Sequence, residues 1–117
     1  MATFTKQLAS GSTSGKAVEI TGTSSGSGQT VHTADSDAGD IDEVTLYATN
    51  IGTVAETLTV EWGATNSANE IKIDIEPQSG LTLIASGLLI SGGLVVSAYA
   101  STASKIMIYA SVINIDA

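Results

Sequence analysis

Between Pro77 and Ser104 the chain has no charged side chain, and this stretch limits the fold more than any other. A membrane-spanning helix needs about 20 mostly apolar residues, a length that Leu81 to Ala100 would meet. The adjacent glycines Gly92 and Gly93 argue against that interpretation, because glycine weakens a helix interior. The residues after them alternate in polarity, as in a strand with one buried face. We therefore expect two or three buried strands here and no membrane helix.

The same period of two residues recurs along the chain, and no window has the period of a helix. Short apolar-polar alternations are separated by turn residues, a pattern typical of a sandwich or a jelly roll. The sequence thus predicts an all-β fold, an antiparallel β-sandwich or jelly-roll-like domain of about eight or nine short strands. The expected strands lie in Lys16–Thr21, Gln29–Ala34, Glu43–Asn50, Glu56–Gly63, Glu70–Pro77, Leu81–Ala85, Leu88–Ile90, Leu94–Ala100 and Ser104–Ile115. Thr3–Leu8 alternates as well and is expected as a further strand or as an extended arm.

Two hairpins follow from the order of these segments. The segments before and after the Gly/Ser tract Gly22–Gly28 are expected to pair loosely across it. Glu43–Asn50 and Glu56–Gly63, separated by a turn, are expected to pair as an antiparallel hairpin with one solvated face, on which Thr59 and Glu61 lie. In the last segment Val112-Ile113 interrupts the alternation, which predicts a bulge.

The length of 117 residues fits one domain. We expect an N-terminal arm with a Gly/Ser connector at 1–15 and a single β-sandwich domain at 16–117. The chain has no cysteine, so neither disulfides nor thiolate metal sites are expected. The first residues lack the pattern of a secretory signal, so synthesis in the cytosol without export is expected.

The net charge of -8, with four lysines and no arginine, restricts the partners. Binding to phosphates needs clustered basic side chains, so nucleic acid is not an expected partner. Anionic membrane surfaces are disfavoured for the same reason. A protein partner remains, or a charge that only keeps the chain in solution.

His32, the one histidine, is the first candidate for chemistry. The alternation places it on an outward-looking position next to an acidic loop. Catalysis by histidine needs a positioned nucleophile and an orienting carboxylate, and no nucleophile motif accompanies His32. A surface or interface role is therefore preferred, and no enzyme activity and no cofactor are expected.

The acidic loop between Asp35 and Glu43 raises the question of calcium, which takes carboxylate oxygens. The possible ligands are Asp35, Asp37, Asp40 and Asp42. Their spacing does not fit an EF-hand loop. A solvated acidic turn is preferred, and no metal site is predicted.

Aromatic residues make up only 4% of the chain, so a stacking platform for sugars is missing. Trp62 shares a face with Leu58 and Val60 and is expected in the core. Tyr47 and Tyr99 lie on the opposite faces of their strands and fit an interface, where tyrosine is enriched. The predicted interface residues are Phe4, Lys6 and Leu8 of the arm, with Tyr47 and Tyr99.

Several segments resemble small all-β virion proteins of tailed bacteriophages. The likeness rests on DEVTLYATNIGTVAETLTVEWG, on the spacing I-x-I-x-I-x-P-x-x-G from Ile71 to Gly80, on GLLISGGLVVSAYAS and on KIMIYASVINI, and covers Asp42 to Ile115. It implies a capsid decoration (cement) protein, acting as a homotrimer on the lattice of the major capsid protein at the virion surface. The segment before Asp42 lies outside it and would serve as an arm that reaches a neighbour.

Three functions remain open at this stage. The preferred one is a structural virion protein that stabilises a capsid through many protein contacts. The second is a receptor- or carbohydrate-binding module of a phage fibre or neck, with the acidic loop holding calcium. The third is a small hydrolase that uses His32 and nearby aspartates.

Overall fold

Nine β-strands form the regular structure of residues 2–116, which are the residues described by the computed structural model. One short 3-10 helix, η1 (Ser67–Asn69), joins two of them. The strands are β1 (Thr3–Leu8), β2 (Val18–Glu19), β3 (Gln29–Thr33), β4 (Asp40–Asn50), β5 (Glu56–Trp62), β6 (Glu70–Ile75), β7 (Thr82–Ile90), β8 (Val95–Ala100) and β9 (Ile106–Asp116). Within this part of the chain no helix has the length and apolar composition needed to cross a membrane.

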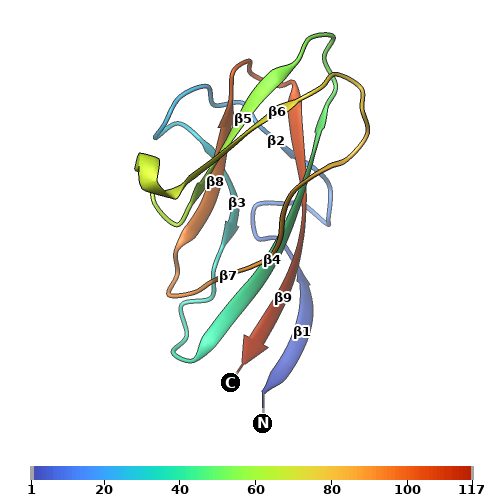
Figure 1. The fold of residues 1–117 in the computed structure, drawn as a ribbon. Helices are drawn as coiled ribbons and strands as arrows, with labels where there is room; N and C mark the ends of the chain where they lie inside the picture. Colours follow the sequence, from blue (N-terminus) through green and yellow to red (C-terminus); the bar gives the residue numbers. More distant parts are fainter. Residues whose placement is uncertain (1, 117) are drawn as a thin grey trace.

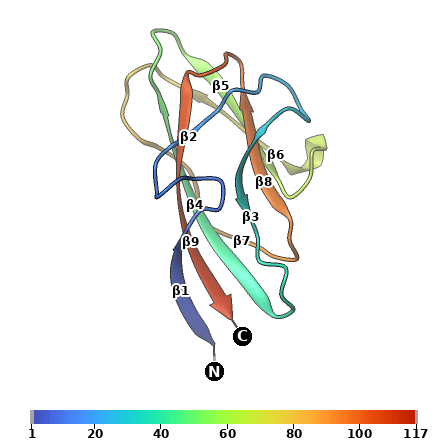
Figure 2. The ribbon, with the colours of Figure 1, turned by 180° about the vertical axis from the view of Figure 1, so that it is seen from behind.

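The strands form two antiparallel sheets that pack face to face (Figure 1; Figure 2 shows the same layers from behind). The five-stranded sheet has the order β1-β9-β4-β7, with β2 beside β9 on the same edge as β1. The four-stranded sheet has the order β3-β8-β5-β6. The predicted all-β sandwich and its number of strands are thus confirmed.

The core lies between the sheets and is built from the residues whose alternation predicted it. Every second side chain of β4 points inward, from Val44 through Leu46 to Ala48, and Leu58 and Val60 of β5 face them. Trp62 packs against this core and is partly buried, as predicted. Burying one such apolar side chain contributes about 1.5–3 kcal/mol. Because the chain has no disulfide, this burial is the main stabilising term.

Both predicted hairpins are wrong, because the loops cross from one sheet to the other. β2 pairs with β9, whereas β3 pairs with β8 of the opposite sheet. β4 likewise pairs with β7 and β9, whereas β5 pairs with β6 and β8. Asn50, buried at the end of β4, fixes the second crossing: its Nδ2 donates to the Val54 and Ile75 carbonyls at 2.8 and 3.0 Å.

The outer face of β5 is not solvated as predicted. Thr59 and Glu61 point away from the core, yet they are only 3% and 1% exposed. β5 is a central strand, with Lys72 of β6 and Tyr99 of β8 beside Thr59 in register. The Gly/Ser loop closes over Glu61, since Ser25 Oγ donates to Glu61 Oε2 at 2.7 Å. A second layer of side chains and loop therefore covers this outer face.

Two details of the later strands also differ from the prediction. Leu81–Ala85 and Leu88–Ile90 are parts of one strand, β7, whose register against β4 shifts between Val44 and Tyr47. Gly87 lies in this irregular part with a φ of 63°, a conformation that glycine adopts without strain. The bulge predicted at Val112-Ile113 is absent from the described residues, because β9 pairs with β4 without a break along its whole length.

β1 belongs to the five-stranded sheet, because Thr3 to Leu8 pair with Asp116 to Ser111 of β9. All six of its side chains are exposed. The ribbon explains this: β1 and the adjoining end of β9 extend past the four-stranded sheet (Figure 1). The segment predicted as an arm is thus held by its own sheet, with both faces free for other contacts.

Candidate interaction surface

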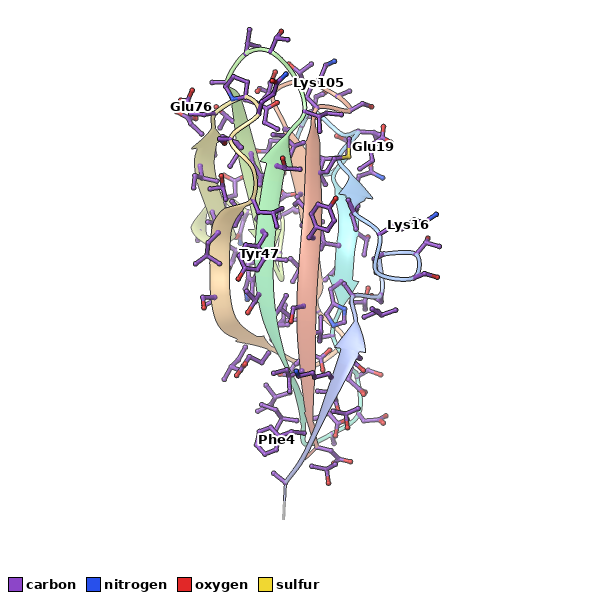
Figure 3. All side chains as sticks on the ribbon, turned by 90° about the vertical axis from the view of Figure 1, so that its right-hand side faces the viewer. Phe4, Lys16, Glu19, Tyr47, Glu76 and Lys105 are labelled. Atoms are coloured by element: carbon purple, nitrogen blue, oxygen red, sulfur yellow. The ribbon has the colours of Figure 1, made fainter. Side chains whose placement is uncertain are left out.

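The outer face of the five-stranded sheet carries six of the twelve exposed large apolar side chains among the described residues: Phe4, Leu8, Tyr47, Leu83, Leu89 and Tyr109. The pairing of the strands places these residues in rows across the sheet. From one end to the other the rows are Phe4, Ile115 and Ile41; Lys6, Ile113, Glu43 and Leu89; Leu8, Ser111 and Thr45; Tyr109, Tyr47 and Leu83; and Met107 and Thr49. We call this set the apolar sheet face (Figure 3).

The largest apolar side chains of the apolar sheet face are exposed to solvent. Phe4 is 67% exposed at the end of β1, and Leu8 is 61% exposed. Leu89 and Leu83 at the β7 edge are 56% and 51% exposed. Single exposed apolar residues are ordinary, but a contiguous apolar patch on a sheet marks a surface that another molecule covers.

Few charges interrupt this face. Lys6 and Glu43 lie in one row on either side of Ile113. Glu19 is the next charge, on the short strand β2 beside Met107. The described residues of this face thus contain no cluster of basic side chains of the kind that binds phosphates.

A groove lies along the edge of β9, in the gap between the end of β1 and the start of β2. Its volume is about 370 Å³, and it is lined by Lys6, Gln7, Leu8, Ala110, Ser111 and Val112. Neither β1 nor β2 pairs with Tyr109 and Ala110 of β9 at this point. The groove is therefore a gap in the edge of the sheet, and it lies next to the apolar sheet face.

Four of the five predicted interface residues lie on one surface. Phe4, Lys6, Leu8 and Tyr47 belong to the apolar sheet face, although they come from strands far apart in sequence. Tyr99 does not, because it points outward from the other sheet and donates a hydrogen bond to Glu70 Oε2 at 3.2 Å. Their part in an interface stays a prediction.

Three exposed large members of this face were not predicted. Leu83 and Leu89 lie in segments that were expected to form buried strands, because these segments belong to the uncharged stretch. β7 is an edge strand of the sheet, and its outer side has no layer above it. The exposure of Tyr109 could have been predicted from the sequence. Tyr109 alternates with Ile106, Ile108 and Ala110, so its side chain faces away from the core.

His32 is not on the surface as predicted but buried, at 2% exposure. β3 shifts register between Thr30 and His32, and this irregularity turns the ring into the sandwich. The Ser10 N–H donates to His32 Nδ1 at 3.0 Å, so that nitrogen carries no proton. The other ring nitrogen, Nε2, then carries the proton and donates to Asp42 Oδ2 at 2.6 Å.

This neutral imidazole joins the two sheets through Asp42 of β4. Asp42 also accepts from Asn114 Nδ2 at 2.7 Å and from the Asp35 N–H at 3.3 Å. Burial raises the pKa of Asp42, but the hydrogen bonds from His32 and Asn114 and from the Asp35 backbone outweigh it, so the pKa lies below its ordinary value of 3.8. The arrangement is a structural hydrogen-bond network.

The network does not have the geometry of a hydrolase. A histidine base needs a free ring nitrogen toward the hydroxyl that it activates. Ser10 is hydrogen-bonded to His32, but through its backbone N–H and not through its hydroxyl. Its hydroxyl accepts from the Thr33 N–H at 2.7 Å. Both ring nitrogens of His32 are thus occupied, and among residues 2–116 no serine or threonine hydroxyl is hydrogen-bonded to the ring.

The acidic loop divides into two parts. Asp35, Asp37 and Asp40 each offer a carboxylate oxygen, and these atoms lie within 4.8 Å of one another. Asp42, the fourth calcium candidate of the sequence, is committed to His32 and Asn114. Asp37 also uses its N–H to donate to Asp35 Oδ1 at 2.9 Å, as in an ordinary Asx turn.

The crowding of these carboxyls perturbs Asp40. Loss of hydration raises its pKa, and the neighbouring carboxyls of Asp35 and Asp116 raise it further, to about 6. A proton shared in such a cluster lowers its negative charge near neutral pH. Protonation of Asp40 relieves part of the mutual repulsion of these carboxyls.

Comparisons with protein-family models, with curated proteins and with solved structures find no match to this chain. What it binds therefore has to follow from its own residues. Of the surfaces described, the apolar sheet face is the one that gathers four of the five predicted interface residues.

Proposed function

We propose that this chain is a structural protein of a tailed-phage virion, a decoration protein that binds the capsid lattice through its apolar sheet face. One observation carries the proposal: Phe4, Leu8, Leu83 and Leu89 lie exposed on the same face of one sheet. Each such side chain contributes about 1.5–3 kcal/mol when it is fully buried. Association itself costs several kcal/mol, so a surface with several of these anchors is needed for stable binding.

The topology supports the same proposal by analogy. Without β1, the strand orders are 2-9-4-7 and 3-8-5-6, which is consistent with a jelly roll. Jelly rolls serve as viral capsid and lectin domains. A shared fold does not by itself imply a shared function, so the analogy adds to the apolar face and does not replace it.

The position of β1 explains how one copy would reach several neighbours. It extends beyond the four-stranded sheet, it pairs along only one edge, and both of its faces are exposed. A second strand can add to such an edge through main-chain hydrogen bonds. In a homotrimer on a lattice, β1 would contact one neighbour while the apolar sheet face binds another, and the combined avidity would stabilise the particle.

The test uses a matched pair of substitutions on opposite sheets. Leu83→Ser changes the apolar sheet face, and Leu94→Ser changes a leucine beside the four-stranded sheet. The two side chains are equally exposed, Leu83 at 51% and Leu94 at 50%. Both leucines are half-exposed, so both variants are expected to fold. The measurements are the mass of the purified chain by analytical ultracentrifugation and its co-sedimentation with tailed-phage capsids that lack decoration protein.

Leu83→Ser is expected to weaken self-association or capsid binding by at least about tenfold, the effect of losing about 1.5 kcal/mol of burial. Leu94→Ser is expected to leave both unchanged. A wild-type chain that stays monomeric at high concentration and does not sediment with capsids would overturn the proposal. Equal effects of the two substitutions would show that the apolar sheet face is not the binding surface.

A receptor- or carbohydrate-binding module is the second candidate, and the close carboxylates of Asp35, Asp37 and Asp40 are the feature that favours it. It predicts that glycan-array signals appear with calcium and disappear with a chelator. Binding that ignores both calcium and chelator would count against this candidate. The decoration function predicts no glycan signal in either condition.

A further inference from the structure

A cavity of about 320 Å³ lies on the outer side of the four-stranded sheet, away from the apolar sheet face. It is bounded by the Gly/Ser loop, by the start of β8 and by the loop after β5. The side chains that give it chemical character are Glu61, Thr30, Thr65, Ser97, Leu94 and Val95. Glycines and one alanine form the rest of its wall, so small residues keep the space open.

Glu61 is the unusual group in this wall. It lies in the central strand β5 and is 1% exposed, and its Oε1 has no hydrogen-bond donor among the described residues. Its Oε2 accepts from Ser25 Oγ at 2.7 Å. Ser25 has one hydroxyl proton, and the Thr65 carbonyl at 3.1 Å competes for it. A buried carboxylate with one shared donor is poorly compensated.

The surroundings of Glu61 do not supply a cation. Glu70 of β6 lies directly opposite Glu61 in register and carries the same charge. Lys72, the basic residue of this sheet, lies 3.8 Å from Glu70 Oε1 and forms its ion pair there. None of the described residues that line the cavity is positively charged. The cavity thus has a negatively charged wall for which the described residues provide no counter-charge.

We propose that this cavity is a binding site for an ammonium or guanidinium group, with Glu61 as its counter-ion. A cationic N–H donor would satisfy Oε1 and would offset the charge of Glu61 and Glu70. The hydroxyls of Thr30 and Ser97 and the carbonyls of the glycine-rich wall are suitable acceptors for the remaining N–H groups. Leu94 and Val95 would contact the aliphatic stem that carries such a group.

The volume separates this ligand from a bare metal ion. One water occupies about 30 Å³ of liquid, so a cavity of about 320 Å³ holds a group the size of an arginine or lysine side-chain end. Glu61 is the only carboxylate among the described lining residues, which is too few for a calcium site. The site is distinct from the proposed lattice contact and does not depend on it, because it lies on the other sheet.

The experiment titrates the ¹⁵N-labelled chain with small probes and follows the amide signals of Gly63, Ser97 and Glu61 by NMR. The probes are Nα-acetyl-arginine N-methylamide and Nα-acetyl-lysine N-methylamide. Nα-acetyl-citrulline N-methylamide, which has nearly the same shape as the arginine probe without its charge, is the neutral control. A capped Gly-Gly-Arg-Gly-Gly peptide distinguishes a side chain of a partner protein from a free small molecule as the source of the cation.

The charged probes are expected to shift these signals in a saturable manner, and the citrulline probe is expected not to. Glu61→Gln keeps the shape of the side chain and should weaken binding by at least about tenfold, since a hydrogen bond to a charged group is lost. Glu70→Gln removes the same charge outside the cavity wall and should leave most of the affinity. If the peptide binds as well as the capped amino acids do, the ligand is a side chain of a partner protein. If the capped amino acids bind and the peptide does not, the ligand is a small molecule.

Leu94→Trp is a second variant, in case Glu61→Gln fails to fold. It fills the cavity from a half-exposed position, leaves Glu61 in place and should abolish binding of the probes. The proposal is wrong if no charged probe moves the signals, if citrulline binds as well as arginine, or if both variants bind like the wild type. Any of these outcomes would mean that the cavity holds only water.

Discussion

Asp42→Asn tests whether the buried network between the sheets stabilises the fold. The carboxylate accepts three hydrogen bonds, from His32, Asn114 and the Asp35 N–H. Asparagine has the same shape but only one acceptor oxygen, and its NH₂ group would point at one of these donors. His32 cannot adapt by changing its tautomer, because its Nδ1 has to accept from the Ser10 N–H.

The size of the effect follows from the burial of each donor. The His32 ring is buried, and a buried donor without an acceptor costs about 1–3 kcal/mol. Asn114 and the Asp35 N–H are partly exposed, so water replaces much of what they lose. The remaining bonds also lose the charge of the acceptor, which brings the expected loss to about 2–4 kcal/mol. A domain of this size is stable by about 5–15 kcal/mol, so the variant should fold but be clearly weakened.

The assay is urea unfolding, followed by the fluorescence of Trp62 and by circular dichroism. With a slope of about 2 kcal/mol per molar urea, the midpoint should fall by roughly 1–2 M. Glu76→Gln removes one negative charge from an exposed side chain and should leave the midpoint within about 0.3 M. Unchanged midpoints for Asp42→Asn would refute the reasoning. The tautomer is checked separately, because ¹⁵N shifts of the ring should show a protonated Nε2 and an unprotonated Nδ1.

Four further outcomes are expected. The pKa of Asp40 is raised to about 6, so the stability that its protonated form contributes is present below pH 3.8 and is lost as the pH rises through 6. Asp40→Asn should therefore reduce the change of the urea midpoint with pH between pH 4 and 7. Asp42 has a lowered pKa, so its contribution is present above pH 3.8 and lost in more acidic solution, which acid titration of the wild type and of Asp42→Asn should separate. Gly11→Ala should destabilise the fold by more than about 1 kcal/mol in a thermal melt, because its Cβ would lie 2.1 Å from the Thr30 carbonyl oxygen. Ile108→Ala should cost about 2–5 kcal/mol in urea unfolding, because Ile108 is fully buried.

The candidate surface was predicted only in part. Phe4, Leu8 and Tyr47 follow from alternation in exposed strands, and they do lie together. Leu83 did not follow, because an apolar residue in an uncharged run has the same local pattern whether its strand is central or at an edge. The cavity at Glu61 gave no signal either, since its walls come from three distant loops and a glutamate in an alternating strand reads as solvated.

His32 is the opposite case, a residue that was predicted to be exposed and is buried. Alternation placed its side chain outward, and one shift of register in β3 turned it into the sandwich. A slip of one residue moves every later side chain of a strand to the other face, and nothing in the local sequence marks where the slip occurs. Asp42, its partner, lies ten residues away in the opposite sheet.

The sequence by itself determined that the chain is an all-β sandwich and which side of most strands faces the core. Those properties depend on a two-residue period that each strand carries alone. Only the tertiary structure decided which strands pair, that Glu61 and His32 are buried, and that the leucines of β7 are exposed. These depend on what lies across from a strand or above it, and such contacts join residues far apart in the chain, where no local pattern records them.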